Sequence, residues 1–286
     1  MKQWLLLMFG CVPSAVAAVV EVPAQFRLYS YDAKYVNAIN QRVSHTITTD
    51  TNQLLLEQFS RAVTVTELPF ARIELEMQGA GVHCTLDRIK TPERQQKYLF
   101  SYPVNFYLGY RLYQRADLTP LGRPVLNEQG EVASLNALFI DDPRSRLLVS
   151  AHFSLGPYLD AEIGKVPAGK KIVVTTSDYY QQFLGMFLAK RAEYAVLFPT
   201  AIQEHYHADL PMPVRSYSIA GSPAVVAGHL MCNKSAESER FLQQVNLALL
   251  ELYKEQAFLQ AHQRYMLPED AALVARLIRA GHVDQY

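Results

Sequence analysis

The sequence of 286 residues predicts an α/β protein of two lobes, each a mostly parallel sheet flanked by helices. Short apolar or β-branched runs alternate with helical segments up to about residue 105, which is the pattern of a parallel sheet. A second alternation of the same kind follows, and the chain then returns through a strand at 226–232. Two lobes joined by a two-strand hinge are expected to hold a ligand cleft between them.

Apolar spacing predicts the elements of the first lobe. Strands are expected at 26–31, 63–68 and 82–86, with a polar loop at 32–49 after the first of them. Thr49 and Asp50 are expected to cap one helix, and Pro69 is expected to begin the next, which stops at the glycines of 79–81. After the return strand, a long amphipathic helix is expected from Ser235 and a last helix from 268 to 278.

The middle of the chain repeats this alternation. An aromatic strand is expected at 106–113 and a turn-rich insertion at 122–134. Further elements are then expected in this order: a strand at 146–150, a loop at 154–157, a helix at 158–163, a strand at 171–175, a helix at 178–190 and a strand at 194–198. We therefore expect the first lobe to comprise 19–104 and 223–286, and the second lobe to comprise 105–222.

The N-terminus has the features of a signal peptide spanning 1–18. Lys2 supplies the positive start, residues 4–12 form a short apolar run, and residues 15–17 resemble a cleavage site. Cys11 offers a lipoprotein anchor as the alternative, although the bulky residues before it fit a lipid-attachment site poorly. No other run is apolar and long enough to span a membrane, so we expect an exported protein.

The charge balance and the motifs exclude several function classes. Lys+Arg and Asp+Glu number 27 each, so no overall positive charge favours nucleic acid. No phosphate loop, Cys-x-x-Cys pair or haem site is found, and no cofactor is expected. His205 and His207 have no third ligand at a telling spacing, so we expect an exposed loop there and no metal site.

Cys84 and Cys232 are the cysteines that remain after the signal peptide. In an oxidising compartment they could form a disulfide, because both lie in strand-like runs. The alternative is two separate buried thiols. We favour the thiols, because disulfides between adjacent strands are strained and the sequence does not show whether the two Cα atoms approach.

The stretch 91–101 is the strongest candidate for a binding site. Thr91 is a helix-capping residue, Pro92 suits the first helical position, and Glu93 places negative charge in the first turn. Arg94 follows at a helix start whose free N–H groups already favour an anion. A carboxylate-bearing small molecule is therefore the expected partner of Arg94.

Several short motifs, taken in order, resemble the extracellular solute-binding proteins of family 3, which have the type-II periplasmic binding protein fold. The motifs are Leu68-Pro69-Phe70-Ala71-Arg72, Gly81-Val82-His83-Cys84, Thr91-Pro92-Glu93-Arg94, Phe100-Ser101-Tyr102-Pro103 and Ala189-Lys190-Arg191-Ala192-Glu193-Tyr194. The resemblance implies a monomeric, non-enzymatic periplasmic protein that binds a small polar solute by hinge closure. Its partner would be an ABC permease or a membrane sensor. An enzyme on the same scaffold, of the dehydratase or cell-wall-lytic type, is the alternative.

The resemblance also implies site residues. Arg94 would clamp a ligand α-carboxylate, and Ser154 would assist from the second lobe. Asp87 and Ile89 stand where amino-acid binders have a small hydroxyl or glycine, and Phe198 stands where they have an aspartate for the ammonium group. These departures leave the identity of the ligand open.

Two further roles are expected. Asp87 would meet a cationic ligand group, or pair with Arg94 or Arg88 when the cleft is empty. Tyr31, Tyr35 and Phe70 are candidates for aromatic walls of the cleft.

Overall fold

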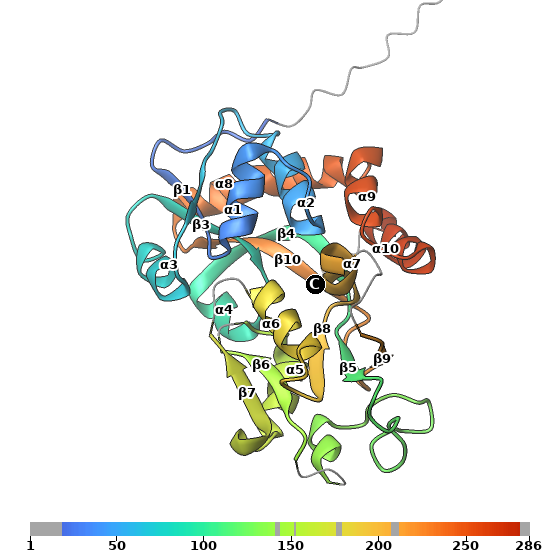
Figure 1. Ribbon diagram of the computed structural model, residues 1–286. Coiled ribbons are helices and arrows are strands. Elements are labelled where there is room, and N and C mark those ends of the chain that lie inside the picture. The colour runs from blue at the N-terminus through green and yellow to red at the C-terminus, as the bar shows by residue number, and fades with distance from the viewer. Residues whose placement is uncertain (1–18, 141–143, 152, 176–178, 207–211, 281–286) are drawn as a thin grey trace, which may run out of the picture.

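Two five-stranded sheets, one in each lobe, form the centre of the protein (Figure 1). The computed structural model describes residues 19–140, 144–151, 153–175, 179–206 and 212–280. The expected signal peptide, including Cys11, lies outside these residues. The predicted two-lobed α/β architecture is confirmed.

The first lobe is built around a mixed sheet with the strand order β2-β1-β3-β10-β4. Strand β1 is parallel to β2 and β3, whereas β10 is antiparallel to β3 and β4. The elements of this lobe are β1 (Phe26–Ser30), α1 (Ala33–Gln41), α2 (Ile47–Leu56), β2 (Val65–Glu67), α3 (Phe70–Glu76), β3 (Val82–Arg88), α4 (Pro92–Lys97), β4 (Tyr98–Leu108), β10 (Val225–Asn233), α8 (Ala236–Leu252), α9 (Gln256–Gln263) and α10 (Pro268–Ala280).

The second lobe has the strand order β7-β6-β8-β5-β9. Strands β7, β6 and β8 are parallel, and β5 is antiparallel to both β8 and β9. Its elements are β5 (Arg111–Arg115), η1 (Leu135–Phe139), β6 (Leu147–Ser150), α5 (Pro157–Lys165), η2 (Ala168–Lys170), β7 (Lys171–Val174), α6 (Tyr179–Leu188), β8 (Tyr194–Leu197), α7 (Pro199–Tyr206) and β9 (Val214–Tyr217). The division of the chain into lobes at residues 105 and 223 stays a prediction.

Two crossing segments, residues 109–110 and 218–224, connect the lobes. The N–H of Gly109 donates to the carbonyl of Ala224 at 2.7 Å. A Cβ atom at Gly109 would lie 1.9 Å from the carbonyl oxygen of Pro223, so only glycine allows this approach. The single strand predicted at 106–113 is wrong, because the chain leaves one sheet after Leu108 and joins the other at Arg111.

Three other local predictions are also wrong, and one strand was missed. The expected polar loop at 32–49 contains α1, capped by the Asp32 carboxylate, and α2 begins after Thr46 rather than at Thr49. His205, expected in an exposed loop, lies in helix α7. Strand β9 was not expected at all. These elements are short and largely polar, and they are stabilised by neighbours in the fold rather than by a strong apolar period.

The core of the first lobe lies between the sheet and α8. The predicted apolar face of α8 is confirmed, because the following residues are all buried: Leu242, Val245, Leu249, Leu252 and Tyr253. Phe106, Phe241 and Phe258 are among the largest fully buried side chains. Helices α1, α2, α9 and α10 contribute to the same core, while α3 contributes to a separate cluster with Tyr29, Tyr31 and Met231.

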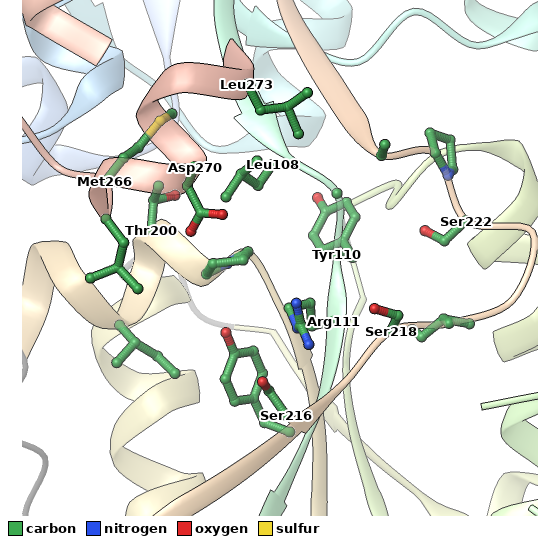
Figure 2. Close-up of a pocket in the computed structure, with 18 of the residues that line it drawn as sticks. Leu108, Tyr110, Arg111, Thr200, Ser216, Ser218, Ser222, Met266, Asp270 and Leu273 are labelled. Carbon is green, nitrogen blue, oxygen red and sulfur yellow. The ribbon is translucent and has the colours of Figure 1, made fainter. Parts of the chain in front are cut away.

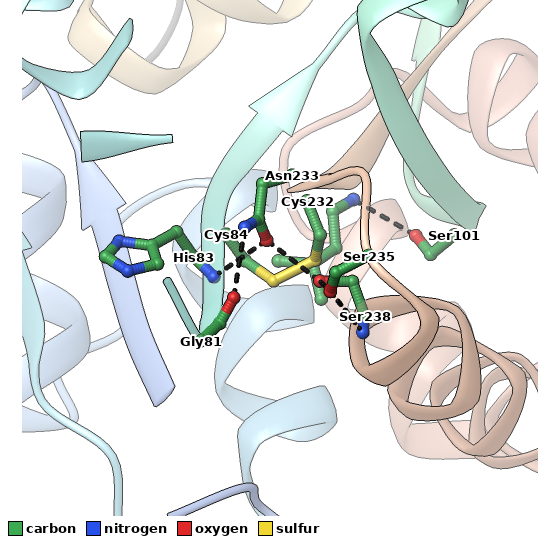
Figure 3. Close-up of a disulfide and its surroundings, with 9 residues drawn as sticks. Gly81, His83, Cys84, Ser101, Cys232, Asn233, Ser235 and Ser238 are labelled. Atoms are coloured by element: carbon green, nitrogen blue, oxygen red, sulfur yellow. Dashed lines mark hydrogen bonds between the residues drawn. A yellow bond between two sulfur atoms is a disulfide. The ribbon is translucent and has the colours of Figure 1, made fainter. Parts of the chain in front are cut away.

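Cys84 and Cys232 form a disulfide, so the prediction of separate thiols is wrong (Figure 3). The residues are direct partners of the antiparallel β3–β10 pair, with Cα atoms 4.1 Å apart. Their side chains therefore meet on one face of the sheet, which the sequence alone could not show. Beside them, the Asn233 side chain accepts from the N–H of His83 and donates to the carbonyl of Gly81, both at 3.0 Å.

His262 of α9 connects that helix to β4. Its Nε2 accepts from the N–H of Phe106 at 3.1 Å, and its Nδ1 donates to the carbonyl of Phe258 at 2.8 Å. Burial lowers the pKa of His262 to about 4, so the ring stays neutral and keeps this tautomer at neutral pH.

Replacing His262 with alanine is expected to lower the free energy of unfolding by about 2–4 kcal/mol, since it leaves a cavity and an unpaired buried N–H. Urea denaturation measures this. The exposed His45 offers a control, and His45→Ala should change stability by less than about 0.5 kcal/mol. Equal effects of the two substitutions would contradict the assignment.

Candidate functional site

A small cavity of about 30 Å³ lies between the lobes. This volume is enough for about one water molecule. Four of the six predicted site residues line it: Asp87, Arg94, Ser154 and Phe198. Arg88, Ile89, Tyr107, Tyr110, Phe153 and the segment Val226–Gly228 complete the lining. We call this region the cleft.

Arg94 reaches the cleft from the first turn of α4. The predicted helix start is confirmed, because the Thr91 hydroxyl accepts from the N–H of Arg94 at 3.3 Å and Pro92 occupies the first helical position. The guanidinium donates through Nη1 to the carbonyl of Ile89 at 2.9 Å. Burial lowers the pKa of Arg94, which means that its charge is partly deprived of water. An anion in the cleft would restore that lost solvation.

Arg88, at the end of β3, is a site residue that the sequence reasoning missed. Its guanidinium lies 5.0 Å from the centre of the Phe70 ring, in cation–π geometry. Its Nε is buried without a hydrogen-bond partner in the described part of the chain. Burial, and then the positive charge of Arg94, lower the pKa of Arg88 to about 10. Its position at the carboxyl end of a strand was the available signal.

Asp87 lies beside these arginines in a left-handed backbone conformation with φ of 53°. Its carboxylate accepts from Thr48 and Tyr107 hydroxyls, each at 3.4 Å. Gly228 makes room for it, since a Cβ there would lie 2.2 Å from Asp87 Oδ1. Burial raises the pKa of Asp87 to about 6, although Arg88, Tyr107 and Thr48 oppose the shift. A cationic or donating ligand group would favour its charged form.

Phe153, which lines the cleft, packs against two aromatic rings of the first lobe. Phe70 lines only the cavity next to the cleft, and Tyr31 lines neither space. Tyr31 and Phe70 of the first lobe stack with ring centres 4.2 Å apart. Phe153 of the second lobe contacts both rings edge to face, at 4.9 and 5.5 Å. The sequence singled out Tyr31 and Phe70 but missed Phe153. Tyr35 is buried in α1 and lines neither this cleft nor the cavity next to it.

Ser154 and Asp160 lie at the N-terminal end of α5. The Ser154 hydroxyl donates to Asp160 Oδ2 at 2.5 Å and accepts from the N–H of Gly156 at 3.1 Å. Because the Ser154 hydroxyl already donates its proton to Asp160, it can only accept a hydrogen bond from a ligand. The Asp160 carboxylate acts on Arg94 across the cleft and opposes the lowering of that arginine's pKa. Asp160 was not singled out in the sequence.

Phe198, at the end of β8, fills the place expected for an ammonium-binding aspartate. Its ring stacks on Tyr110 at 3.8 Å and on Tyr107 at 4.9 Å. The side of the cleft toward the crossing segments is therefore an aromatic wall rather than an acidic one.

A second cavity of about 410 Å³ adjoins the cleft between α3 and α4. Arg88 and Arg94 line both spaces, and Phe70, Tyr98 and Met231 add apolar surface. Neither arginine forms an ion pair within the described residues. Glu74 and Glu93 also line the adjoining cavity and oppose the lowering of the Arg94 pKa without forming an ion pair with it in the described chain. The cleft and this cavity together offer two guanidinium groups and space for a small organic molecule.

Glu204 of α7, in the second lobe, bonds to α2 of the first lobe. Its Oε1 accepts from the N–H of Ile47, the first residue of α2, at 3.0 Å. Burial, and then the charges of Asp87 and Asp50, raise the pKa of Glu204 to about 8, against the opposing effect of the Ile47 N–H. In this structure the Glu204 carboxyl is therefore protonated at neutral pH.

Stability is expected to fall as the pH rises from about 5 to about 9, because the folded protein holds a proton on Glu204 that the unfolded chain releases near 4.5. The contribution of Glu204 to stability is fully present below pH 4.5 and is lost as the pH rises through about 8. Glu204→Gln, which is neutral at every pH, should flatten this part of the profile in urea denaturation. An unchanged profile would show that another group causes it.

The described residues contain no group of three or more His, Cys, Asp or Glu side chains that could hold a metal ion. His205 lies in α7 and not in the expected loop, and His207 lies outside the described residues. Within the same residues, no helix has the length and apolar character needed to cross a membrane.

Several solved structures have the same fold as this protein. An ancestral arginine-binding protein bound to arginine superposes with a TM-score of 0.59 at 14% identity, covering 85% of this chain and 98% of that one. A substrate-binding protein of an ABC uptake transporter from Streptococcus pneumoniae with bound histidine gives 0.58 at 14% identity, covering 84% and 92%. A histidine kinase sensor domain with similarity to periplasmic binding proteins gives 0.58 at 12% identity, covering 85% and 96%. No protein-family model matches the sequence, and no curated protein is similar to it in sequence.

The fold is therefore that of the two-lobed periplasmic binding proteins, as the sequence motifs predicted. In this protein the cleft that such a fold creates carries two arginines, a buried aspartate and an aromatic wall.

Proposed function

We propose that this protein is an exported, monomeric solute-binding protein that closes its two lobes around a small carboxylate-bearing solute. The observation that carries the proposal is the pair of half-buried guanidinium groups of Arg88 and Arg94, which have no ion-pair partner in the described chain. Guanidinium recognises a carboxylate through two parallel hydrogen bonds, and the contact is strongest when water is excluded.

Closure supplies the mechanism. The first lobe offers Arg88, Arg94 and Asp87, and the second offers Phe153 and the start of α5. A solute that contacts both lobes favours the closed arrangement, and a membrane partner can then read that arrangement. The partner we propose is an ABC permease or a membrane sensor. The names of the structural neighbours include both kinds.

The disulfide supports the proposed location in the periplasm. Disulfides persist in oxidising compartments and are rare in the cytosol. The features of residues 1–18 agree with export.

A thermal-shift screen over amino acids, polyamines and small organic acids tests the proposal. A ligand that binds the folded state raises the unfolding temperature by mass action. We expect solutes with a carboxylate to raise it, and their neutral amides to have no effect. Stabilisation by polyamines alone would contradict the proposed carboxylate recognition.

An enzyme on the same scaffold is the second candidate, because the raised pKa of Asp87, about 6, suits acid–base chemistry. Native mass spectrometry separates the two. We expect the bound solute to be recovered chemically unchanged. A product that disappears in Asp87→Asn would instead establish turnover.

A further inference from the structure

A cavity of about 540 Å³ lies beside the crossing segments (Figure 2). The first lobe supplies Leu108 and, from α10, Asp270 and Leu273. The second lobe supplies Arg111 and Tyr113 of β5, and Thr200 of α7. We call this space the rear cavity. It shares only Tyr110 with the lining of the cleft, so the two are separate spaces.

Two buried polar atoms in the wall of the rear cavity have no hydrogen-bond partner within the described residues. They are Nε of Arg111 and Oγ of Ser222. Arg111 also forms no ion pair in that part of the chain. Buried polar atoms without partners are costly, so native proteins rarely keep them without a water or ligand to satisfy them.

The donors face a common space. Figure 2 shows the hydroxyl groups of Ser218 and Ser222 directed toward the region that the Arg111 side chain occupies. A guanidinium with two hydroxyl groups suits a carboxylate, which accepts hydrogen bonds at both oxygens.

The rest of the wall restricts the solute further. Glu131 and Asp270 also line the cavity, and their negative charge disfavours a ligand with more than one negative charge. Apolar surface comes from Leu108, Ile202, Met266 and Leu273. The volume is within the range of small-molecule sites, about 300–1,000 Å³.

We propose that the rear cavity is a second solute site, which takes a small organic monocarboxylate with an apolar body. The carboxylate lies at Arg111 and Ser222, and the body lies against the apolar side chains of both lobes. This inference does not depend on the function of the cleft. Because both lobes supply walls, a bound solute also favours the lobe arrangement of this structure.

Benzoate is a suitable probe, with benzamide as its neutral counterpart and phthalate as a dianion of similar shape. Binding is measured by calorimetry on the full protein carrying Arg94→Ala, which removes the proposed anion contact of the cleft. We expect saturable binding of benzoate, and weaker or no binding of benzamide and phthalate. Adding Arg111→Gln should weaken benzoate binding by about tenfold or more.

Arg191→Gln is the matched control, because it makes the same charge change on an exposed side chain of the second lobe. It should leave benzoate binding unchanged, while Ser222→Ala should weaken it with little effect on folding. Circular dichroism and the unfolding temperature confirm that each variant is folded.

Three outcomes would overturn the proposal. One is benzoate binding that survives Arg111→Gln and Ser222→Ala. Another is binding to the wild-type protein that Arg94→Ala abolishes, which would place benzoate in the cleft and leave the proposed function standing. The third is the absence of benzoate binding to every form.

Discussion

Replacing Arg94 with alanine is expected to weaken solute binding by about 100-fold, because it leaves a desolvated carboxylate without its charged partner. The fold should survive. The Arg94 side chain forms one hydrogen bond, to the carbonyl of Ile89, and the capping of α4 depends on the Thr91 side chain and the backbone of residue 94. Calorimetry with the solute found in the thermal-shift screen measures the change.

Arg61→Ala is the matched control for this experiment. The Arg61 guanidinium also donates to one carbonyl, that of Pro23 at 2.9 Å, but it is exposed and lies outside the cleft. It should leave affinity unchanged. Arg88→Gln should weaken binding as well, since Arg88 faces the same space as Arg94. Undiminished affinity in a folded Arg94→Ala protein would refute the role of Arg94 as the anchor.

Removal of the disulfide is expected to lower the free energy of unfolding by about 3–5 kcal/mol. Cys84 and Cys232 are 148 residues apart, so the bond closes a long loop and strongly restricts the unfolded chain. Both residues belong to the first lobe, on either side of the excursion through the second. The bond therefore holds together two separate stretches of chain that form one sheet.

Guanidinium denaturation of the double variant Cys84→Ala/Cys232→Ala measures the loss, with the oxidised and reduced wild-type protein as references. Hydrogen exchange should show faster opening in β3 and β10, and little change in β6 and β8. A loss that falls equally on both lobes would contradict this account. So would a double variant as stable as the oxidised protein.

Local chemistry made part of the cleft predictable. Thr91 and Pro92 define a helix start wherever they are placed, because a cap and a fixed φ act within one turn. The position of Arg94 follows from that helix start. The strand before it was also recognisable, because a strand whose two faces are both buried is read as a short apolar run. Residues 82–86 are all buried.

Other parts of the site depend on residues that are distant in sequence. Phe153 was missed because its contacts, Tyr31 and Phe70, belong to the other lobe. The contact of Glu204 could not be predicted, because its partner is a backbone N–H more than 150 residues away, in α2. Neither a sequence periodicity nor a short motif predicts such contacts. The same limit led to the wrong prediction of free thiols, since the strand register decides which cysteines meet.

The sequence alone determined the two-lobed α/β architecture, the capped helix start and the arginine it carries, because each depends on spacing or on contacts within a few residues. Only the tertiary structure decided the rest. It joined Cys84 to Cys232, placed Arg88 beside Arg94 with no ion pair among the described residues, and created the rear cavity around Arg111. These features arise where separate stretches of chain are brought together, and burial there sets the charge and hydrogen-bonding state of each group.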